Sequence, residues 1–169
     1  KSFVTGKPLF GTLIALLRDG RPIAGVIDMP ALDERWVGVE GQPTTFGGRQ
    51  VRVRTCDSLD RAWLYATSPQ MFDTGEAIAF ERLRSACYAA VWGADLYAYG
   101  LLASGRVDLV CEASLKPYDY CAVVPVIEGA GGVITDWQGA PLGLHSGGRA
   151  LAAGDAKLHA VAREMLAGA

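Results

Sequence analysis

The residues best suited to chemistry are two acids in the segment 112–122, which reads EASLKPYDYCA. A buried strand is expected to end at Glu112, and Asp119 falls in the first turn of a helix that begins near Pro117. Two carboxylates at the carboxyl end of a strand can hold a hard cation and a hydroxylated substrate. The alternative is that Asp119 only stabilises the start of its helix and that Glu112 faces water.

Other catalytic patterns are absent from the sequence. His145 and His159 lie far apart and match no zinc-binding spacing. The glycine-rich motifs of nucleotide-binding loops and the G-x-S-x-G nucleophile motif do not occur.

The first part of the chain has the pattern of an antiparallel meander. Apolar runs flank Asp19-Gly20, a pair typical of hairpin turns, and two later segments alternate apolar and polar residues. The strands expected here are 9–17, 22–29, 34–40 and 50–54.

Helical and strand patterns alternate after Ser58, which predicts a sheet covered by helices on both faces. The expected fold is therefore a layered α/β (α+β) fold, with a subdomain of residues 1–57 and an α/β subdomain of residues 58–169. Pro125 predicts a kink inside the third helix. The strands expected in this part are 62–67, 89–92, 107–112, 133–137 and 151–153, and the helices are 75–87, 95–104, 117–130 and 156–166.

Composition restricts the classes of partner. The formal net charge is −2 and half of the residues are apolar, which argues against a nucleic-acid or anionic-membrane partner. The four cysteines form no C-x-x-C pair and lie in or beside apolar runs, as buried reduced thiols do. No apolar run approaches the length of a membrane span, so a soluble cytoplasmic protein is expected.

Three separated segments together resemble one family of phosphatases. Tyr118-Asp119 at a helix start is followed by EGAGGVITD at 128–136, and WGAD at 92–95 precedes an earlier helix. These segments resemble the W-D-x-A-A type motif, the E-A-G-G helix exit and the substrate loop of the inositol monophosphatase family. Tyr118 replaces the usual Trp of that motif. The segments 95–99 and 115–120 are more similar to the histidinol-phosphatase branch than to inositol-specific members.

The opening residues, KSFVTGKP, resemble the stretch that follows the D-P-x-D-G-T motif in this family. The N-terminal third of the family's domain, with most of its metal-binding and catalytic acids, is therefore expected to be missing. The catalytic residues would lie in that third, and residues 1–169 alone are expected to be inactive.

The resemblance implies an inositol monophosphatase/sugar phosphatase-like fold and a Mg²⁺-dependent phosphomonoesterase. In the complete enzyme, Mg²⁺ would bind the phosphate oxygens and activate a water molecule. Asp119 would be a metal ligand, and the substrate-binding residues would be Gly93, Ala94, Asp95 and Glu112.

The preferred reaction is hydrolysis of histidinol phosphate to histidinol and phosphate. An inositol monophosphatase, a 3′-phosphoadenosine phosphatase and a fructose-bisphosphatase relative remain open as alternatives within the superfamily. A non-catalytic fragment or interaction module is a further alternative, because a fold alone does not fix a function. The expected partner is a small phosphate ester, and the chain could form a homodimer.

Overall fold

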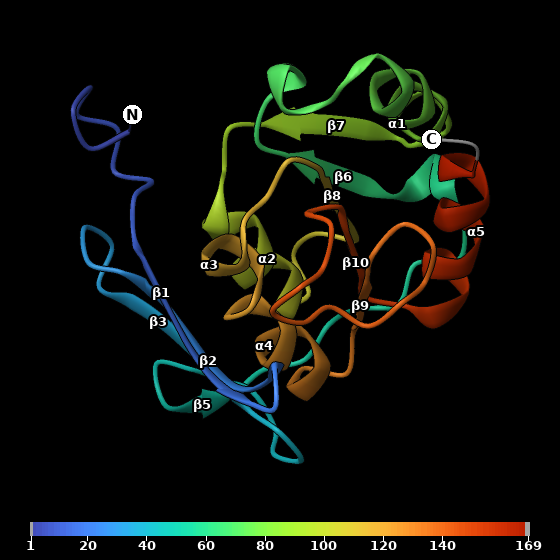
Figure 1. Ribbon diagram of the computed structural model, residues 1–169. Helices are drawn as coiled ribbons and strands as arrows, with labels where there is room; N and C mark the ends of the chain where they lie inside the picture. The colour runs from blue at the N-terminus through green and yellow to red at the C-terminus, as the bar shows by residue number, and fades with distance from the viewer. Residues whose placement is uncertain (1, 168–169) are drawn as a thin grey trace.

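The computed structural model describes residues 2–167, which form two sheets with helices between and beside them (Figure 1). The first sheet is an antiparallel meander in which each strand pairs with the next along the chain. Its strands are β1 (Thr12–Arg18), β2 (Arg21–Met29), β3 (Glu34–Val39), β4 (Thr45–Phe46) and β5 (Arg49–Gln50).

The second sheet is mixed and has the strand order β7-β6-β8-β10-β9. β6 pairs in parallel with both β7 and β8, whereas β10 pairs antiparallel with β8 and β9. The strands are β6 (Trp63–Ala66), β7 (Ala89–Trp92), β8 (Leu109–Glu112), β9 (Val133–Thr135) and β10 (Ala150–Ala153).

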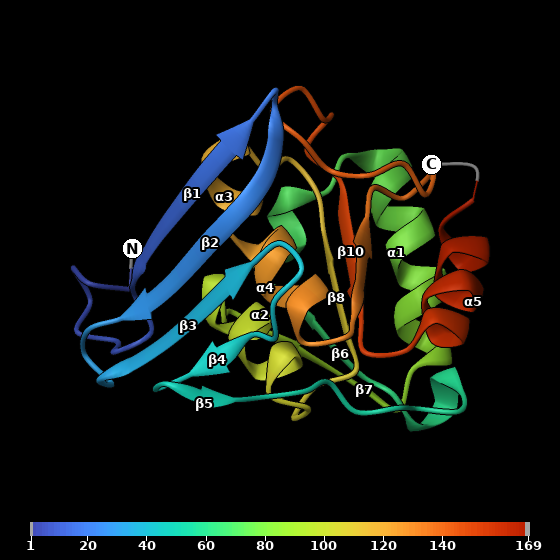
Figure 2. The same ribbon diagram turned by 90° about the horizontal axis from the view of Figure 1, so that it is seen from below.

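The helices complete a layered arrangement. α2, α3 and α4 lie between the two sheets, while α1 and α5 lie together on the far side of the second sheet (Figures 1 and 2). The helices are α1 (Thr74–Ala86), α2 (Leu96–Ala103), α3 (Pro117–Tyr120), α4 (Val123–Gly129) and α5 (Ala156–Leu166), with short 3-10 helices η1 (Leu59–Arg61) and η2 (Pro69–Met71). None of these helices is long and apolar enough to cross a membrane.

The hairpin of β1 and β2 forms as its turn residues predict. Asp19 and Gly20 both have positive φ, 51° and 77°, the backbone that a tight two-residue hairpin requires. Glycines then allow α4 to approach this sheet closely. A Cβ at Gly25 would lie 1.9 Å from the carbonyl oxygen of Ala122, and one at Gly38 would lie 2.4 Å from that of Pro125. Side chains at these positions would force the helix away from the sheet.

The helix expected over 117–130 is divided in two. α3 ends at Tyr120 and α4 begins at Val123. Pro125 has no N–H to donate to the carbonyl of Cys121, and its ring crowds that carbonyl, so the interruption lies in the turn before the proline.

The strand expected over 50–54 is wrong for most of its length, because β5 ends at Gln50. Beyond it the chain stays extended without a strand partner. The N–H of Val53 donates to the carbonyl of Ala130, and Arg54 forms two hydrogen bonds with the buried Asp108, with its Nε 2.6 Å from Oδ1. Arg54 thereby connects this segment to the start of β8. The strand expected over 133–137 is also shorter and ends at Thr135.

The hydrophobic core runs through both sheets. One cluster joins the inner face of the first sheet, through Ile27 and Trp36, to α2, α4 and one face of the second sheet. A second cluster fills the space between the other face of that sheet and helices α1 and α5. The two sheets share the first cluster, so the division into subdomains at residue 57 stays a prediction.

Candidate functional site

Two predicted site segments, the loop 93–95 and Glu112, meet Thr67 at one edge of the second sheet. β6, β7 and β8 are parallel, so their carboxyl ends lie at the same edge. Thr67 follows β6, the loop 93–95 follows β7, and Glu112 is the last residue of β8. Topology thus brings together residues that are far apart in the sequence, at the edge where α/β sheets commonly bind ligands.

Glu112 is buried, with 3% of its surface exposed. The Tyr99 hydroxyl donates to its Oε2 over 2.8 Å, and the Thr67 hydroxyl donates to its Oε1. Burial raises the pKa of the Glu112 carboxyl, the two hydrogen bonds oppose that rise, and the nearby charge of Asp95 adds to it. The simpler alternative, in which Glu112 faces water, is therefore wrong.

Asp95 has an unusual backbone, with φ 48° and ψ −134°. Such a conformation costs a non-glycine residue about 1–3 kcal/mol and is most often found where the surrounding structure serves a site. The residue precedes α2, yet its side chain makes no capping hydrogen bond with that helix. Helix capping therefore does not explain the position of Asp95 before α2.

The loop 93–95 turns sharply at Gly93, where φ is 85°. Its carbonyl accepts a hydrogen bond of 2.5 Å from Lys7 Nζ, which connects the loop to the opening segment of the chain. Ala94 is buried, with 5% exposure, and packs in the central core. The loop is thus held in place by the packing of Ala94 in the core and by the hydrogen bond from Lys7 to Gly93.

Asp119 is half-buried in α3. Its Oδ2 accepts a hydrogen bond of 2.8 Å from the backbone N–H of Lys116, so the residue does stabilise the helix start. Among the described residues no hydrogen bond is assigned to its other oxygen, Oδ1. The charges of Glu112 and Asp119 both help to raise the pKa of Tyr99, after the larger effect of burial, which places the two acids around one phenol.

The described residues do not form a complete metal site. No group of three or more His, Cys, Asp or Glu side chains within residues 2–167 is arranged to hold a metal ion. Mg²⁺ needs several oxygen ligands, and Asp119 offers one free carboxylate oxygen. This part of the chain can supply a ligand to a metal site, but it cannot form the site alone.

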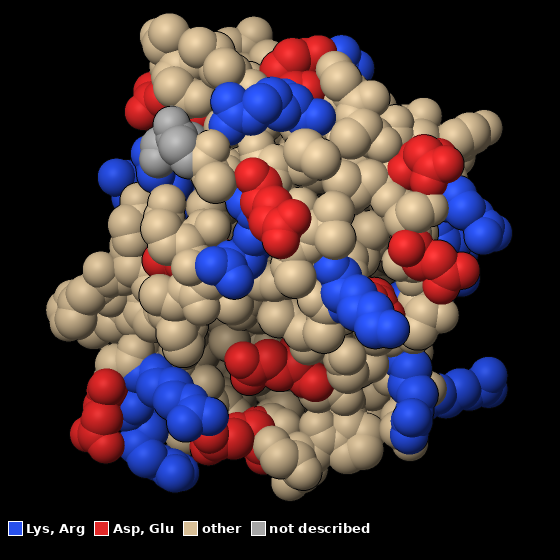
Figure 3. Space-filling model, turned by 90° about the vertical axis from the view of Figure 1, so that its right-hand side faces the viewer, with Lys and Arg blue, Asp and Glu red and all other residues tan. Residues whose placement is uncertain are grey.

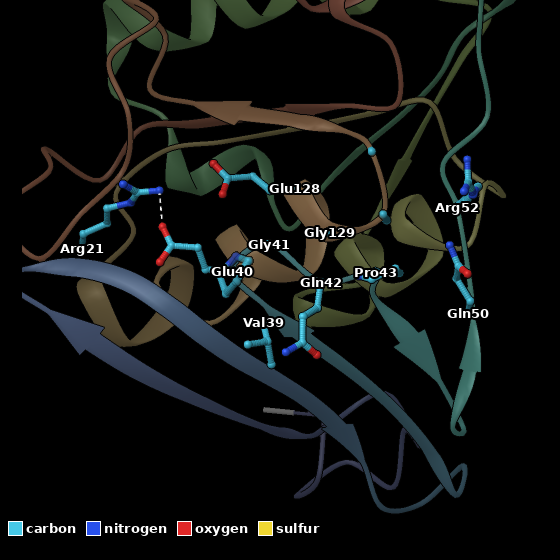
Figure 4. Close-up of a pocket in the computed structure, with 13 residues that line it drawn as sticks. Arg21, Val39, Glu40, Gly41, Gln42, Pro43, Gln50, Arg52, Glu128 and Gly129 are labelled. Carbon is cyan, nitrogen blue, oxygen red and sulfur yellow. Dashed lines mark ion pairs between the residues drawn. The ribbon is translucent and has the colours of Figure 1, made fainter.

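A separate polar pocket of about 480 Å³ lies between the β2–β3 end of the first sheet and the end of α4 (Figure 4). Arg21 and Glu40 form an ion pair of 2.5 Å there, and Glu128 also lines the space. None of the predicted site residues lines this pocket. The Arg21–Glu40 pair is already compensated, so the acids at the edge of the second sheet are the better candidate for the functional site.

No specific role was predicted from the sequence for Tyr99, Thr67 or Lys7. The position of Thr67 directly after a strand could have indicated its place at the sheet edge. Nothing local indicates that Tyr99 points at Glu112, because that contact depends on how α2 packs against β8.

The chain is a layered α/β domain with acids at the carboxyl ends of parallel strands, and comparison with known proteins identifies its family. Residues 1–167 match the description "Inositol monophosphatase family". The chain belongs to the inositol monophosphatase family.

Its relatives include both enzymes and solved structures. The chain is 50% identical over 173 residues to the bifunctional phosphatase IMPL2, chloroplastic, of Arabidopsis thaliana, covering 98% of this chain and 50% of that protein. It is 33% identical over 141 residues to the histidinol-phosphatase of Chlorobaculum parvum, covering 82% of this chain and 54% of that protein. An inositol monophosphatase structure from Zymomonas mobilis matches with a TM-score of 0.96 and 46% identity, over 98% of this chain and 65% of that one. The chain thus spans about half the length of these curated relatives.

Proposed function

We propose that this chain is part of a Mg²⁺-dependent phosphatase that hydrolyses a small phosphate monoester carrying a positive charge, with histidinol phosphate as the preferred substrate. The observation that carries the substrate assignment is the pair Asp95 and Glu112. These acids lie close enough for one charge to raise the pKa of the other. No ion pair found among the described residues includes either of them.

Two neighbouring carboxylates without a cation favour a cationic ligand. Burial makes the charge of Glu112 costly, and an ammonium or imidazolium group would offset that cost through charge-assisted hydrogen bonds. Histidinol phosphate carries an amine and an imidazole, whereas inositol phosphate offers only hydroxyls beyond its phosphate. The histidinol-phosphatase relatives, which are 32–33% identical to this chain, support this choice.

Asp119 would serve the reacting end of the substrate. Its free Oδ1 would be one ligand of a Mg²⁺ site completed by the D-P-x-D-G-T acids that the family carries. Bound Mg²⁺ would supply charge neutralisation at the phosphate and an activated water. The chain's own residues would orient the ester, with Asp119 on the metal side and the Asp95–Glu112 pair on the side of the leaving group.

The charge distribution is consistent with a small-molecule substrate. On the face that carries α1 and α5, basic and acidic side chains alternate without a broad patch of one sign (Figure 3). A nucleic-acid surface would need clustered basic residues on some face of the protein.

Kinetics of the full-length protein test the substrate assignment. Asp95→Asn and Glu112→Gln should each lower kcat/KM for histidinol phosphate about 10- to 100-fold, because a hydrogen bond to a charged group contributes about 1.5–3 kcal/mol. The loss on a neutral ester, glycerol phosphate, should be several-fold smaller. Asp57→Asn is the control, since its side chain is 85% exposed. Equal losses on both substrates would contradict the assignment, and a wild-type preference for inositol phosphate would favour that alternative.

Asp119→Asn tests the metal role separately. The variant keeps the shape and one acceptor oxygen but removes the charge that a hard cation requires. We expect kcat to fall at least about 100-fold on every ester, with a melting temperature close to that of the wild type. Near-normal turnover at limiting Mg²⁺ would show that Asp119 only begins its helix.

A further inference from the structure

The hydrogen bonds around Glu112 come from two different elements. Tyr99, on α2, donates to Oε2, and Thr67, directly after β6, donates to Oε1. Glu112 itself ends β8. The carboxylate is therefore fixed by three elements that meet at the edge of the sheet, and rotation about its last side-chain bond would break both hydrogen bonds.

The Tyr99 hydroxyl is already engaged, because it donates its hydrogen bond to Glu112 over 2.8 Å. The residue is 1% exposed, and its ring packs in the central core among α2, α4 and the second sheet. A phenol buried in this way needs a partner for its O–H, and Glu112 provides it. Tyr99 thus acts through Glu112.

The surroundings of Glu112 would otherwise favour a neutral carboxyl. Burial and the negative charge of Asp95 both oppose ionisation, and the two hydroxyl donors favour it. A protonated Glu112 would lose its attraction for a cationic group. The ionisable groups facing this network are Asp95 before α2, Tyr99 on α2, Cys111 on β8 and Asp119 on α3.

We propose that Tyr99, assisted by Thr67, is the positioning residue that gives this site its specificity: the two hydroxyls hold the Glu112 carboxylate in place to receive the positively charged group of the substrate. This inference rests on the proposed function for the identity of the substrate. The arrangement of the three side chains is independent of that identity.

Tyr99→Phe in the full-length protein is the central experiment, because it removes one hydroxyl and keeps the ring. kcat/KM for histidinol phosphate should fall about 10-fold or more, mainly through KM, since a hydrogen bond to a charged group is lost. kcat/KM for glycerol phosphate should change less than about threefold. Thr67→Val should act in the same direction, and Thr67→Ser, which restores the hydroxyl, should recover most of the loss.

Tyr97→Phe is the matched control. It is the same substitution on the same helix, but Tyr97 faces Glu34 and the Trp36 ring rather than Glu112. It should leave the ratio of the two kcat/KM values unchanged. Equal losses on both substrates in Tyr99→Phe, at an unchanged melting temperature, would overturn the proposal. If Tyr99→Phe fails to fold, the Thr67 variants decide the question.

A titration of the Glu112 carboxyl by carbon NMR separates this inference from the proposed function. Loss of the donor should raise the Glu112 pKa in Tyr99→Phe, whichever ester the enzyme prefers. A raised pKa in an enzyme that shows no preference for a cationic ester would refute the proposed substrate and support the positioning contact. An unchanged pKa would overturn the positioning role even if histidinol phosphate is the substrate.

Discussion

The two sheets differ in how many of their faces are covered. In the second sheet, every residue of β8 and β10 is buried, with α2 and α4 on one face and α1 and α5 on the other. In the first sheet, β1 alternates between exposed and half-buried residues, and only its inner face meets the core. The middle of the outer face is nonetheless apolar and, by strand register, contains Ile14, Leu16, Ala24, Val26, Val37 and Val39, whereas the ion pair of Asp28 and Arg35 lies toward one end of that face.

This difference bears on the position of Glu112. It lies at the end of a strand that is enclosed on both faces, where its carboxylate is buried and hydrogen-bonded. The exposed apolar surface of the first sheet, with Ile14 59% and Leu16 60% exposed, is instead typical of a surface that another segment or protein covers. The candidate site therefore lies at the second sheet, both faces of which are covered by helices of the described chain.

Paired truncations should give the largest difference between the sheets. Leu151→Ala, at a fully buried position of β10, should lower the free energy of unfolding by about 2–5 kcal/mol, because it leaves a cavity. Leu16→Ala on β1 should cost less than about 1 kcal/mol in the chain of residues 1–169. Urea denaturation of both variants measures the contrast. A comparable loss at Leu16 would show that its outer face is already covered.

The sequence predicted this contrast only in part. The hairpin at Asp19-Gly20 and the helices α1 and α5 depend on local signals, namely turn residues, periodicity and caps, and the structure confirms them. The segment 50–54 has a strand's alternation, but its hydrogen bonds go to Ala130 and Asp108. An alternation of apolar and polar residues predicts which side chains face inward. It does not predict whether a neighbouring strand is present to form the hydrogen bonds.

The site shows the same limit. Glu112, Asp119 and the 93–95 loop could be selected from the sequence, and the parallel strand ends bring the loop and Glu112 to one edge of the sheet. Their roles stay predictions. The burial of Glu112 and its contact with Tyr99 could not be predicted, because they depend on the packing of α2 against β8.

The outer face of the first sheet should also govern self-association. The double variant Ile14→Lys and Leu16→Lys places two charges on an apolar surface beside an exposed strand edge, an arrangement that opposes edge-to-edge pairing. We expect association of the chain of residues 1–169 to weaken about tenfold or more in sedimentation experiments. Ile78→Lys is the control, since that side chain is 58% exposed on α1. An equal effect at Ile78 would mean that charge alone, and not this face, controls association.

The smallest expected effect is on the pH dependence of stability. It concerns His159, a residue of α5 that is buried against the second sheet. The imidazole is 5% exposed and its Nε2 lies 3.1 Å from the Thr135 hydroxyl. Burial, and secondarily the charge of Arg163, lower its pKa below the ordinary value of 6.5. In the unfolded chain the ring takes up a proton near pH 6.5, whereas in the folded chain it does so only at lower pH. The unfolded state therefore binds more protons between these two pKa values, and stability falls as pH decreases through that range.

His159→Gln removes this titration and keeps a hydrogen-bonding side chain at the position. The free energy of unfolding between pH 7 and pH 5.5, measured by urea denaturation, should then depend less steeply on pH than in the unmodified chain. His145→Gln is the matched control, because that side chain is exposed and should leave the slope unchanged. An equally steep slope in His159→Gln would show that groups other than His159 cause the pH dependence, and would weaken the contrast between the two sheets.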